Sequence, residues 1–343
     1  MTQSNLKAWQ IRADDYPVHG SAQERLRFAL NYAILAPSTH NTQPWRFHLE
    51  DGSVELFAER RRALPVIDPD DRELVMACGA ALCNLLIALH HYGWGTLVEQ
   101  FPEGPESDLL ARVSLAVPAH ASCQEHRLFD CIPRRHACYL PFDEDPVGGE
   151  VLRDLARAAS QEGARLVVVD DLARVDLIEL VEQADRELEA DPAYRKEFAD
   201  WMRANSSRQG TGVPGYSRGL GNLFSWLAPA VERRFDLGKG HAEQDRELAW
   251  CSALVCVLAS DEDTPLHWLM AGRALQNVLL TGVSYDLQAS TLNPPLHRSE
   301  LRTQLTQLLG LAGHPQAIVR MGRPPATVRR PPTPRLAASD VME

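Results

Sequence analysis

The sequence predicts an α+β fold in which one structural unit occurs twice along the chain. Two long apolar segments with helical spacing, near residues 72–92 and 266–285, each follow one strand-like segment and precede another. The two segments also align with each other at an offset of 193 residues. In addition, residues 36–47 connect a helix-like pattern to a strand-like pattern through small, hydroxylated and amide side chains. These observations indicate a duplicated α+β unit that carries one unusual loop.

Length and composition are those of a globular protein. The chain has 343 residues, of which 45% are hydrophobic and 24% charged, which is enough for two domains or one large one. Its net charge of -11 argues against a nucleic-acid partner, which would require a basic face. The N-terminus has no apolar core of a signal peptide, and the apolar run 74–89 contains Asn84 and is short for a membrane span. We therefore expect a cytoplasmic protein with no membrane partner, and we read its seven cysteines, which lack CxxC spacing, as reduced thiols.

The first unit is predicted over residues 1–125, beginning with a loose lead-in over 1–20. Its further elements are expected to be a helix over 23–35 that is stopped by Pro37, a hairpin around Asp51-Gly52, a long helix from a capping box at 70–73 to about Tyr92, a strand near Leu97 and a strand over 109–117.

The second unit is predicted over residues 126–343. Its elements are expected to be a helix over 150–159, a strand over 165–169, a helix over 173–188 with a polar extension to 201, a strand over 254–259, the long helix over 266–285, a strand near Thr291 and a strand over 318–321. Residues 204–222 are rich in Gly, Ser and Arg and predict a long loop before an amphipathic helix over 224–235. An insertion is therefore expected over about 204–245, and a Pro/Arg-rich arm ends the chain.

The internal repeat is carried by the two long helices. Six aligned positions between residues 78 and 94 are identical, namely Gly79/Gly272, Ala81/Ala274, Leu82/Leu275, Asn84/Asn277, Leu86/Leu279 and Tyr92/Tyr285. Coincidence is the alternative, because apolar helices share heptad-like similarity. A duplicated unit predicts a pseudo-two-fold fold, equivalent to a homodimer joined into one chain. The small Gly79 and Gly272 would then let the two helices approach closely.

The loop after the first helix offers short donors and acceptors that can lie against a flat polar heterocycle. It reads Ala36-Pro37-Ser38-Thr39-His40-Asn41-Thr42-Gln43-Pro44-Trp45. This stretch resembles the APSxxNxQPW signature of the FMN-dependent nitroreductase superfamily. The wider run through Trp94 is similar to the Acg-like branch, in which two nitroreductase-type units are fused. An ordinary turn-rich loop is the alternative, since Pro, Ser and Asn favour turns.

The resemblance implies a nitroreductase-like fold, that is, a pseudo-dimer with long central helices and mixed or antiparallel sheets. It also implies one FMN site built from both units. Five residues of the loop match the element that covers the flavin ring and ribityl chain in the family: Pro37, Ser38, Thr39, Asn41 and Gln43. The second site is expected to be degenerate, because Gln161-Glu162-Gly163 stands where another such loop would be needed.

A phosphate-binding element is implied near the start of the second unit. Arg134, Arg135 and His136 match the basic motif of the family, and a planar guanidinium can bind two phosphate oxygens at once. The sequence departs from the motif afterwards, where Ala137 replaces a hydroxyl residue and Tyr139 stands in place of a second Arg. Tyr139 could still donate one hydrogen bond to the phosphate. A solvated pair of arginines is the alternative for Arg134 and Arg135.

Two further elements are implied by the resemblance. A backbone N–H after the second long helix binds flavin N5 in the family, and Leu292 and Asn293 occupy that position; Pro294 has no N–H, which favours Asn293. A C-terminal cation reaches the phosphate, for which Arg335 is the best match and Arg329 and Arg330 are candidates. The alternative for this basic, Pro-rich tail is a segment without fixed structure.

The insertion is interpreted as a lid over the flavin. Tyr216, Phe224 and Trp226 are expected to stack on the ring or to close the pocket. The alternative is a surface insertion that packs on its own aromatic side chains. No metal site is predicted, since the sequence has no HExxH and the adjacent His90 and His91 do not share a helical face.

The resemblance leads to two hypotheses about function. The first is an FMN-dependent oxidoreductase that transfers a hydride through flavin N5 to or from a small planar organic substrate, with NAD(P)H as candidate electron donor and no catalytic side chain. The second is an Acg-like protein that binds and sequesters FMN under a closed lid. In both cases the chain is expected to be a monomer, as a pseudo-dimer, or a weak homodimer.

Overall fold

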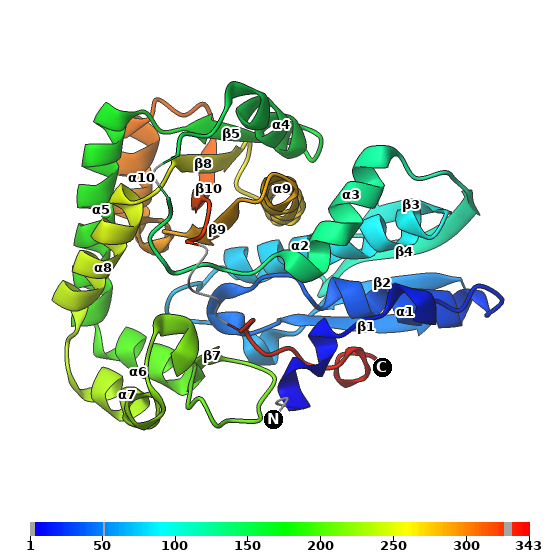
Figure 1. Cartoon of the computed structure of the whole chain (residues 1–343), viewed down its shortest axis with the longest axis horizontal. Helices are drawn as coiled ribbons and strands as arrows, with labels where there is room; N and C mark the ends of the chain where they lie inside the picture. The colour runs from blue at the N-terminus through cyan, green and yellow to red at the C-terminus, as the bar shows by residue number, and fades with distance from the viewer. Residues whose placement is uncertain (1–3, 51, 144, 326–330) are drawn as a thin grey trace.

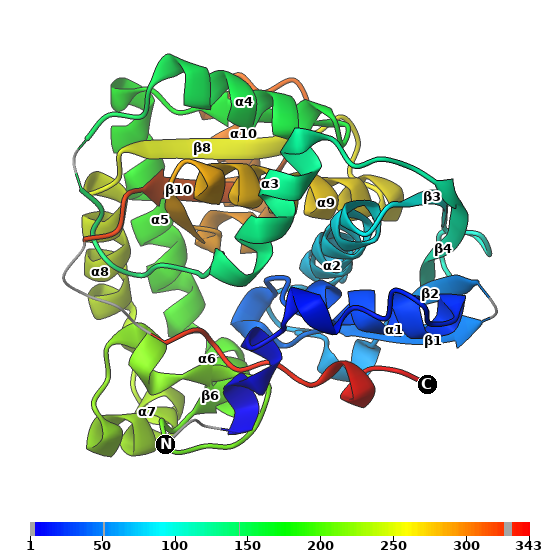
Figure 2. The same cartoon turned by 45° about the vertical axis from the view of Figure 1, so that its right-hand side comes forward.

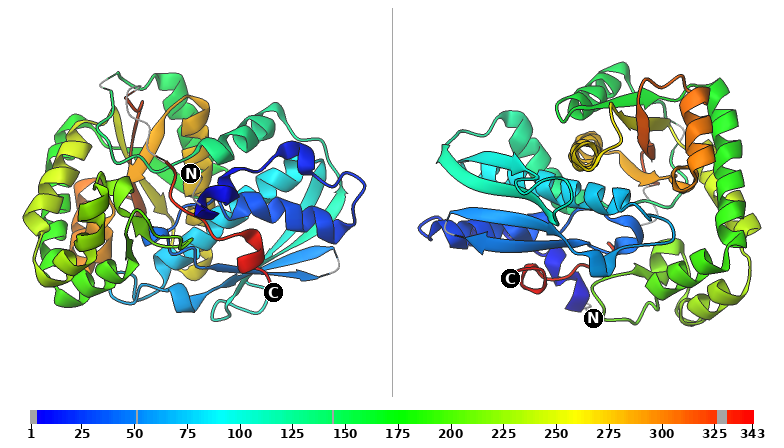
Figure 3. Two further views of the ribbon diagram at one scale, coloured as in Figure 1. Left: turned by 60° about the horizontal axis from the view of Figure 1, so that its bottom comes forward. Right: turned by 180° about the vertical axis from the view of Figure 1, so that it is seen from behind.

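The architecture is α+β, as predicted, and contains two four-stranded antiparallel sheets. The computed structural model describes residues 4–50, 52–143, 145–325 and 331–343. The first sheet has the order β1-β2-β4-β3 and consists of β1 (Trp45–Glu50), β2 (Ser53–Ala58), β3 (Trp94–Gln100) and β4 (Leu109–Pro118). The second has the order β5-β8-β10-β9 and consists of β5 (Ala164–Val168), β8 (Leu254–Ser260), β9 (Gln288–Thr291) and β10 (His314–Gly322). The two sheets lie on opposite sides of the long helices α2 and α9 (Figure 3).

Ten α-helices occur in the part of the chain that the structure describes. They are α1 (Ala22–Ala33), α2 (Arg72–His91), α3 (Cys123–Cys131), α4 (Gly149–Ser160), α5 (Asp171–Ala190), α6 (Pro192–Trp201), α7 (Asn222–Arg234), α8 (Gly238–Trp250), α9 (Pro265–Ser284) and α10 (Ser299–Leu308). A small parallel pair, β6 (Met202–Arg203) and β7 (Val213–Pro214), lies beside α6 and α7 at one end of the molecule (Figure 1). The sequence patterns did not reveal α3, α8 and α10.

The two sheets share one topology. In each, the long helix connects the second strand of the sheet order to the fourth, so that β2-α2-β3-β4 corresponds to β8-α9-β9-β10. The helices α2 and α9 cross at their repeated glycines. A Cβ added to Gly79 would lie 2.2 Å from the carbonyl oxygen of Leu269, and one added to Gly272 would lie 2.0 Å from that of Met76. Only glycine permits this close approach of the two backbones.

The repeated asparagines of the long helices make equivalent hydrogen bonds. Asn84 Nδ2 donates to the carbonyl oxygen of Tyr32 near the end of α1 (3.0 Å), and Asn277 Nδ2 donates to that of Ala158 near the end of α4 (3.1 Å). Both side chains are buried, and each donates to a carbonyl in the last turn of a helix. The same residue therefore has the same role in both halves of the chain.

The start of α2 differs from the prediction. Asp71 has a left-handed φ of 58° and its side chain makes no capping bond, so the predicted capping box at 70–73 is wrong. Instead, the carboxylate of Asp68 accepts hydrogen bonds from the backbone N–H groups of Glu73 (3.0 Å) and Leu74 (2.9 Å). Helix α2 has the length and composition of a membrane span, but most of it is buried inside the protein, as expected of a core helix.

The C-terminal arm returns to the first sheet. The N–H of Phe47 in β1 donates to the carbonyl of Val341 (2.7 Å), and the N–H of Glu343 donates to that of Phe47 (2.9 Å). The arm runs beside the N-terminal turns, as Figures 1 and 2 show in red and dark blue. This path brings Arg335 to the loop that follows α1.

Candidate cofactor site

The signature loop between α1 and β1 has a strained backbone. His40, Asn41 and Gln43 all have positive φ values, of 49°, 55° and 53°. Such conformations cost of the order of 1–3 kcal/mol each and persist only where the surroundings impose them. The Oγ of Ser38 accepts a hydrogen bond from the N–H of Gln43 (2.9 Å) and so closes the loop on itself. Pro37 is half-buried at its start.

The amide side chains of this loop hold the insertion and the C-terminal arm. Asn41 Nδ2 donates to the carbonyl of Gly212 (3.1 Å), whose N–H donates in return to the carbonyl of Asn41 (3.2 Å). Gln43 Nε2 donates to the carbonyl of Gly210 (2.7 Å), and its Oε1 accepts from the N–H of Leu336 (3.0 Å). These bonds fasten residues 210–212 directly onto the signature loop.

Two buried arginines lie against the same loop. Arg335, only 4% exposed, donates from Nη1 to Asn41 Oδ1 (2.7 Å) and from Nη2 to the carbonyl of Ala36 (3.0 Å). Arg135, 5% exposed, donates from Nη2 to the carbonyl of Leu35 (3.2 Å). Within the described ranges neither guanidinium has a carboxylate partner. Burial lowers the pKa of Arg135 to about 10, and burial together with the charge of Arg135 lowers the pKa of Arg335.

His136 lies beside these two arginines as a neutral imidazole. Its ring packs edge-on against Trp9, with centroids 4.7 Å apart, and Trp9 also lies beneath the guanidinium of Arg335 at 5.0 Å. Burial, followed by the charges of Arg135 and Arg335, lowers the pKa of His136 to about 3. The Nδ1 of His136 and the Nε atoms of both arginines are buried and have no hydrogen-bond partner among the described residues. Uncompensated buried cations with free donors fit an anion such as a phosphate.

A second part of the site is centred on Glu73 in α2. Its buried carboxylate accepts hydrogen bonds from Thr39 Oγ1, from Asn293 Nδ2 (2.9 Å) and from His297 Nε2 (3.1 Å), and Arg72 Nη2 donates to it as well (3.1 Å). Burial acts to raise the pKa of Glu73, but His297, Arg72 and the other donors outweigh it and hold the pKa below its usual value. Thr39 and Asn293, predicted from separate motifs, are thus joined by one carboxylate.

Sequence reasoning missed Glu73, which it read only as part of a helix cap. An acidic residue that opens an otherwise apolar helix was the available signal. It missed Trp9 and His297 as well, for which no motif gave a signal.

The remaining predicted residues differ in their placement. Leu292 is buried in the core beside the second sheet, and its N–H donates to the carbonyl of Ile318 (2.9 Å), so this N–H is already used within the fold. Arg134 lies at the surface and pairs with Asp286 (2.9 Å), outside the cluster of Arg135 and Arg335. Tyr139 is 38% exposed. Arg329 and Arg330 fall outside the described residues.

The insertion covers the signature loop through its backbone, and two of its aromatic side chains turn away. Phe224 and Trp226 on α7 are 67% and 69% exposed, so the prediction that they stack on the ring or close the pocket is wrong. Burial of the opposite face of α7, which carries Ser225 and Glu232, directs them to solvent. Tyr216 is half-buried and donates its hydroxyl to the carbonyl of Pro332 in the arm (2.9 Å).

Comparison with known proteins identifies relatives along nearly the whole chain, although no protein-family model matches it. The chain is 33% identical over 332 residues to "Putative NAD(P)H nitroreductase Rv3131" of Mycobacterium tuberculosis (strain ATCC 25618 / H37Rv), spanning 95% of this chain and 93% of the relative. It is 30% identical over 319 residues to "Putative NAD(P)H nitroreductase acg" of the same strain, spanning 89% and 93%.

A solved structure with partial similarity is the FMN-dependent NfnB of Mycobacterium smegmatis in complex with NADPH. It is 18% identical, and the match covers 64% of this chain and 97% of that chain with a TM-score of 0.41.

Proposed function

The chain belongs to the nitroreductase superfamily, in its Acg-like branch, and on this premise we propose that it is an FMN-dependent oxidoreductase. The observation that carries the proposal is the pair of buried arginines, Arg135 and Arg335, which lie beside the signature loop and have no carboxylate partner in the described part of the chain. A buried charge is costly unless an opposite charge meets it. The phosphate of FMN supplies such a charge.

The residues of the chain have distinct roles in this proposal. Arg135, Arg335 and His136 would hold the phosphate, and the backbone of Asn293 would face the flavin ring. When bound, FMN supplies the redox chemistry, which is hydride transfer to or from a small planar organic substrate. The carboxylate of Glu73 accepts a hydrogen bond from Thr39 and another from Asn293, and so holds these two side chains close together. The names of the relatives favour NAD(P)H as the electron donor.

The test is reconstitution of the purified chain with FMN, followed by an assay of NADH and NADPH oxidation with a nitroaromatic or a quinone as acceptor. We expect a protein-bound flavin absorption spectrum, one FMN per chain, and acceptor-dependent oxidation of one nucleotide. Failure to retain FMN after gel filtration would contradict the proposal that FMN is the cofactor. Retained FMN without any reduction of the acceptor would contradict the proposal that the protein is an oxidoreductase.

We further propose that residues 1–125 and 126–343 are two fused nitroreductase-like units, so that one chain is a pseudo-dimer. The equal strand orders of the two sheets and the matching bonds of Asn84 and Asn277 support this division. A monomer that binds one FMN is expected from light scattering behind gel filtration. A stable homodimer with FMN bound between two chains would contradict it.

A second candidate function is sequestration of FMN, which the fastened insertion favours. Asn41 and Gln43 both bond to residues 210–212, so the insertion lies closed over the loop. Replacement of the 204–235 segment by a short linker distinguishes the oxidoreductase from the FMN-sequestering protein. At equal FMN content, faster reduction of a bulky quinone indicates a lid that excludes substrate, whereas slower reduction indicates a segment that forms the substrate pocket. Unchanged turnover would refute both roles of the segment.

A further inference from the structure

Three side chains at the base of the insertion converge in a geometry suited to a metal ion. They are Glu189 near the end of α5, Glu232 on α7 and His241 on α8, and their ligand atoms all lie within 4.8 Å of one another. His241 Nδ1 and Glu189 Oε1 are 2.8 Å apart. Glu189 and Glu232 are 1% and 3% exposed, so this group is inside the protein.

Among the described residues, His241 is the one basic side chain within ion-pair distance of either carboxylate of this trio. Glu182, two helical turns before Glu189 on the same face of α5, is paired with both Arg186 (2.7 Å) and Arg246 (2.9 Å). Among the described residues, by contrast, Glu189 pairs with His241 alone and Glu232 with no basic side chain. The Oε2 of Glu189 and the Oε1 of Glu232 are buried and have no hydrogen-bond donor within the described ranges. Two buried carboxylates that face each other require a cation or a shared proton between them.

A third buried carboxylate adds to the negative charge. Asp185 lies one helical turn before Glu189, is 6% exposed, and its Oδ2 is also without a donor among the described residues. Burial, followed by the charges of Asp245 and Glu189, raises the pKa of Asp185. Arg218 and Arg186 lower the pKa of Asp185 in return and so offset part of this negative charge.

We infer that Glu189, Glu232 and His241 form a binding site for one divalent transition-metal ion of the Zn²⁺ or Mn²⁺ type. One imidazole with two carboxylates is a ligand set that these ions accept, and three protein ligands leave a position for water. Ligands of one tetrahedral Zn²⁺ stand about 3.3 Å apart, given metal–ligand distances of about 2.0–2.1 Å. A bound ion would draw the ligand atoms, which lie within 4.8 Å of one another, to that spacing.

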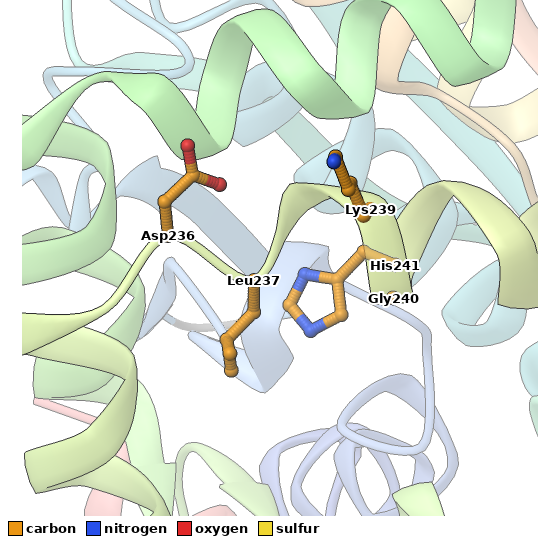
Figure 4. Close-up of a pocket in the computed structure, with 5 residues that line it drawn as sticks. All are labelled: Asp236, Leu237, Lys239, Gly240 and His241. Carbon is orange, nitrogen blue, oxygen red and sulfur yellow. The ribbon is translucent and has the colours of Figure 1, made fainter.

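A route for the ion is present beside the trio. His241 lines a pocket of about 440 Å³ together with Asp236, Leu237, Lys239 and Gly240, at the start of α8 (Figure 4). The imidazole therefore connects the buried carboxylates to this pocket, which can admit water and a hydrated cation.

The site would fasten the insertion to the rest of the protein. Glu232 and His241 belong to the insertion over 204–245, whereas Glu189 belongs to α5, which precedes it. A bound ion would cross-link α5, α7 and α8 and stabilise the closed position of residues 210–212. This inference does not depend on the flavin.

The test uses the untagged full chain, stripped with EDTA and titrated with ZnCl₂ and with MnCl₂ in a calorimeter. We expect one ion per chain, confirmed by elemental analysis after gel filtration, and a higher thermal midpoint with the ion bound. Glu189→Gln, Glu232→Gln and His241→Ala should each weaken binding tenfold or more and abolish the thermal shift. Glu50→Gln is the matched control, because His48, Glu50 and Glu55 form a similar but more exposed trio on the first sheet.

Several outcomes would overturn the inference. They are the absence of binding by the wild-type chain, wild-type affinity in Glu232→Gln and His241→Ala, or loss of binding in Glu50→Gln. X-ray absorption at the Zn edge provides a check that needs no variant. A first shell of nitrogen and oxygen with an imidazole signature is expected, and a sulfur shell would assign the ion to cysteines instead. Absence of binding would leave a proton shared by Glu189 and Glu232 as the explanation of their contact.

Discussion

At the scale of single residues, the candidate site contains two kinds of buried charge. The carboxylate of Glu73 is surrounded by donors from Thr39, Asn293 and His297, so its charge is fully compensated. In the part of the chain that the structure describes, Arg135 and Arg335 donate to neutral acceptors alone. Compensated charges stabilise the native structure, whereas uncompensated ones are available to a ligand. The compensated carboxylate of Glu73 therefore positions the residues of the site, and the uncompensated guanidinium groups of Arg135 and Arg335 are available to bind an anion.

Removal of the negative charge of Glu73 should destabilise the fold. In Glu73→Gln the side chain keeps its shape, but Arg72 and His297 lose their carboxylate partner, which we expect to cost about 3 kcal/mol. Urea unfolding measures the change in the free energy of unfolding. Glu99→Gln is the control, because this side chain is 65% exposed and its pairing with Arg112 should be worth less than about 1 kcal/mol. Equal stability of the two variants would contradict the proposed role of Glu73.

Buried histidines should make the protein sensitive to acid. Burial is the main cause that lowers the pKa of both His40 and His136 from 6.5 to about 3. Between pH 6.5 and 3 the unfolded chain therefore binds protons that the native chain does not, so the free energy of unfolding falls as the pH falls through this window. His40→Gln and His136→Gln should each flatten that dependence, as measured by urea unfolding at several pH values, whereas exposed His19→Gln should not. If the free energy of unfolding depends on pH in both the His40 and the His136 variant as it does in the wild-type chain, these histidines are not the cause of the acid sensitivity.

Motifs identified several residues of the site but not their neighbours. Thr39, Asn41 and Arg135 were predicted because each lies in a short pattern that resembles a family signature. The contacts that give them a role come from distant parts of the chain, such as Glu73 to Thr39 and Gly212 to Asn41. A single sequence carries no periodicity or spacing that reports such pairs.

At the scale of elements, the crossing of α2 and α9 determines how closely the two sheets approach. The helices meet at Gly79 and Gly272, where a single added carbon would clash with the opposite backbone. Backbones cannot give way as the ends of flexible side chains can, so the crossing tolerates no larger residue.

Even the smallest side chain at either glycine should be destabilising. Gly79→Ala and Gly272→Ala are each expected to lower the free energy of unfolding by about 2 kcal/mol through overpacking, although alanine favours helix. Gly240→Ala on exposed α8 is the matched control, since an added Cβ there meets no atom within 4 Å, and it should be neutral or slightly stabilising. Thermal denaturation of the three variants gives their midpoints relative to the wild-type chain. An equal change of the midpoint in all three would show that the helices are not tightly packed at their crossing.

Elements with strong periodicity were predictable, and short polar ones were not. Helices α1, α2 and α9 and strands β4 and β8 lie within a few residues of their predicted bounds, because long apolar patterns report burial directly. Helices α8 and α10 have mixed polar sequences and are formed by packing on α5. The start of α2 was misread because Asp71 adopts a left-handed conformation that no local pattern indicates.

At the scale of the whole molecule, the candidate site is assembled from segments that are far apart in the chain. The signature loop comes from the first half, Arg135 from the connection between the sheets, Gly212 from the insertion and Arg335 from the arm. The arm is held by pairing with β1, and the insertion is held by the loop itself. The cluster of Arg135 and Arg335 therefore forms only when these distant segments are folded together, and it was the resemblance to a family, not a local pattern, that implied their common role.

The measurement that tests the central claim most directly compares FMN with riboflavin, which differ only in the phosphate. If Arg135 and Arg335 hold the phosphate, the wild-type chain binds FMN at least about tenfold more tightly than riboflavin, since each charged hydrogen bond is worth about 1.5–3 kcal/mol. Arg135→Ala and Arg335→Ala should remove that preference while the affinity for riboflavin stays unchanged, and Arg61→Ala, with a side chain 84% exposed, should keep it. A preference for FMN that survives both substitutions, measured by quenching of flavin fluorescence, would contradict the account.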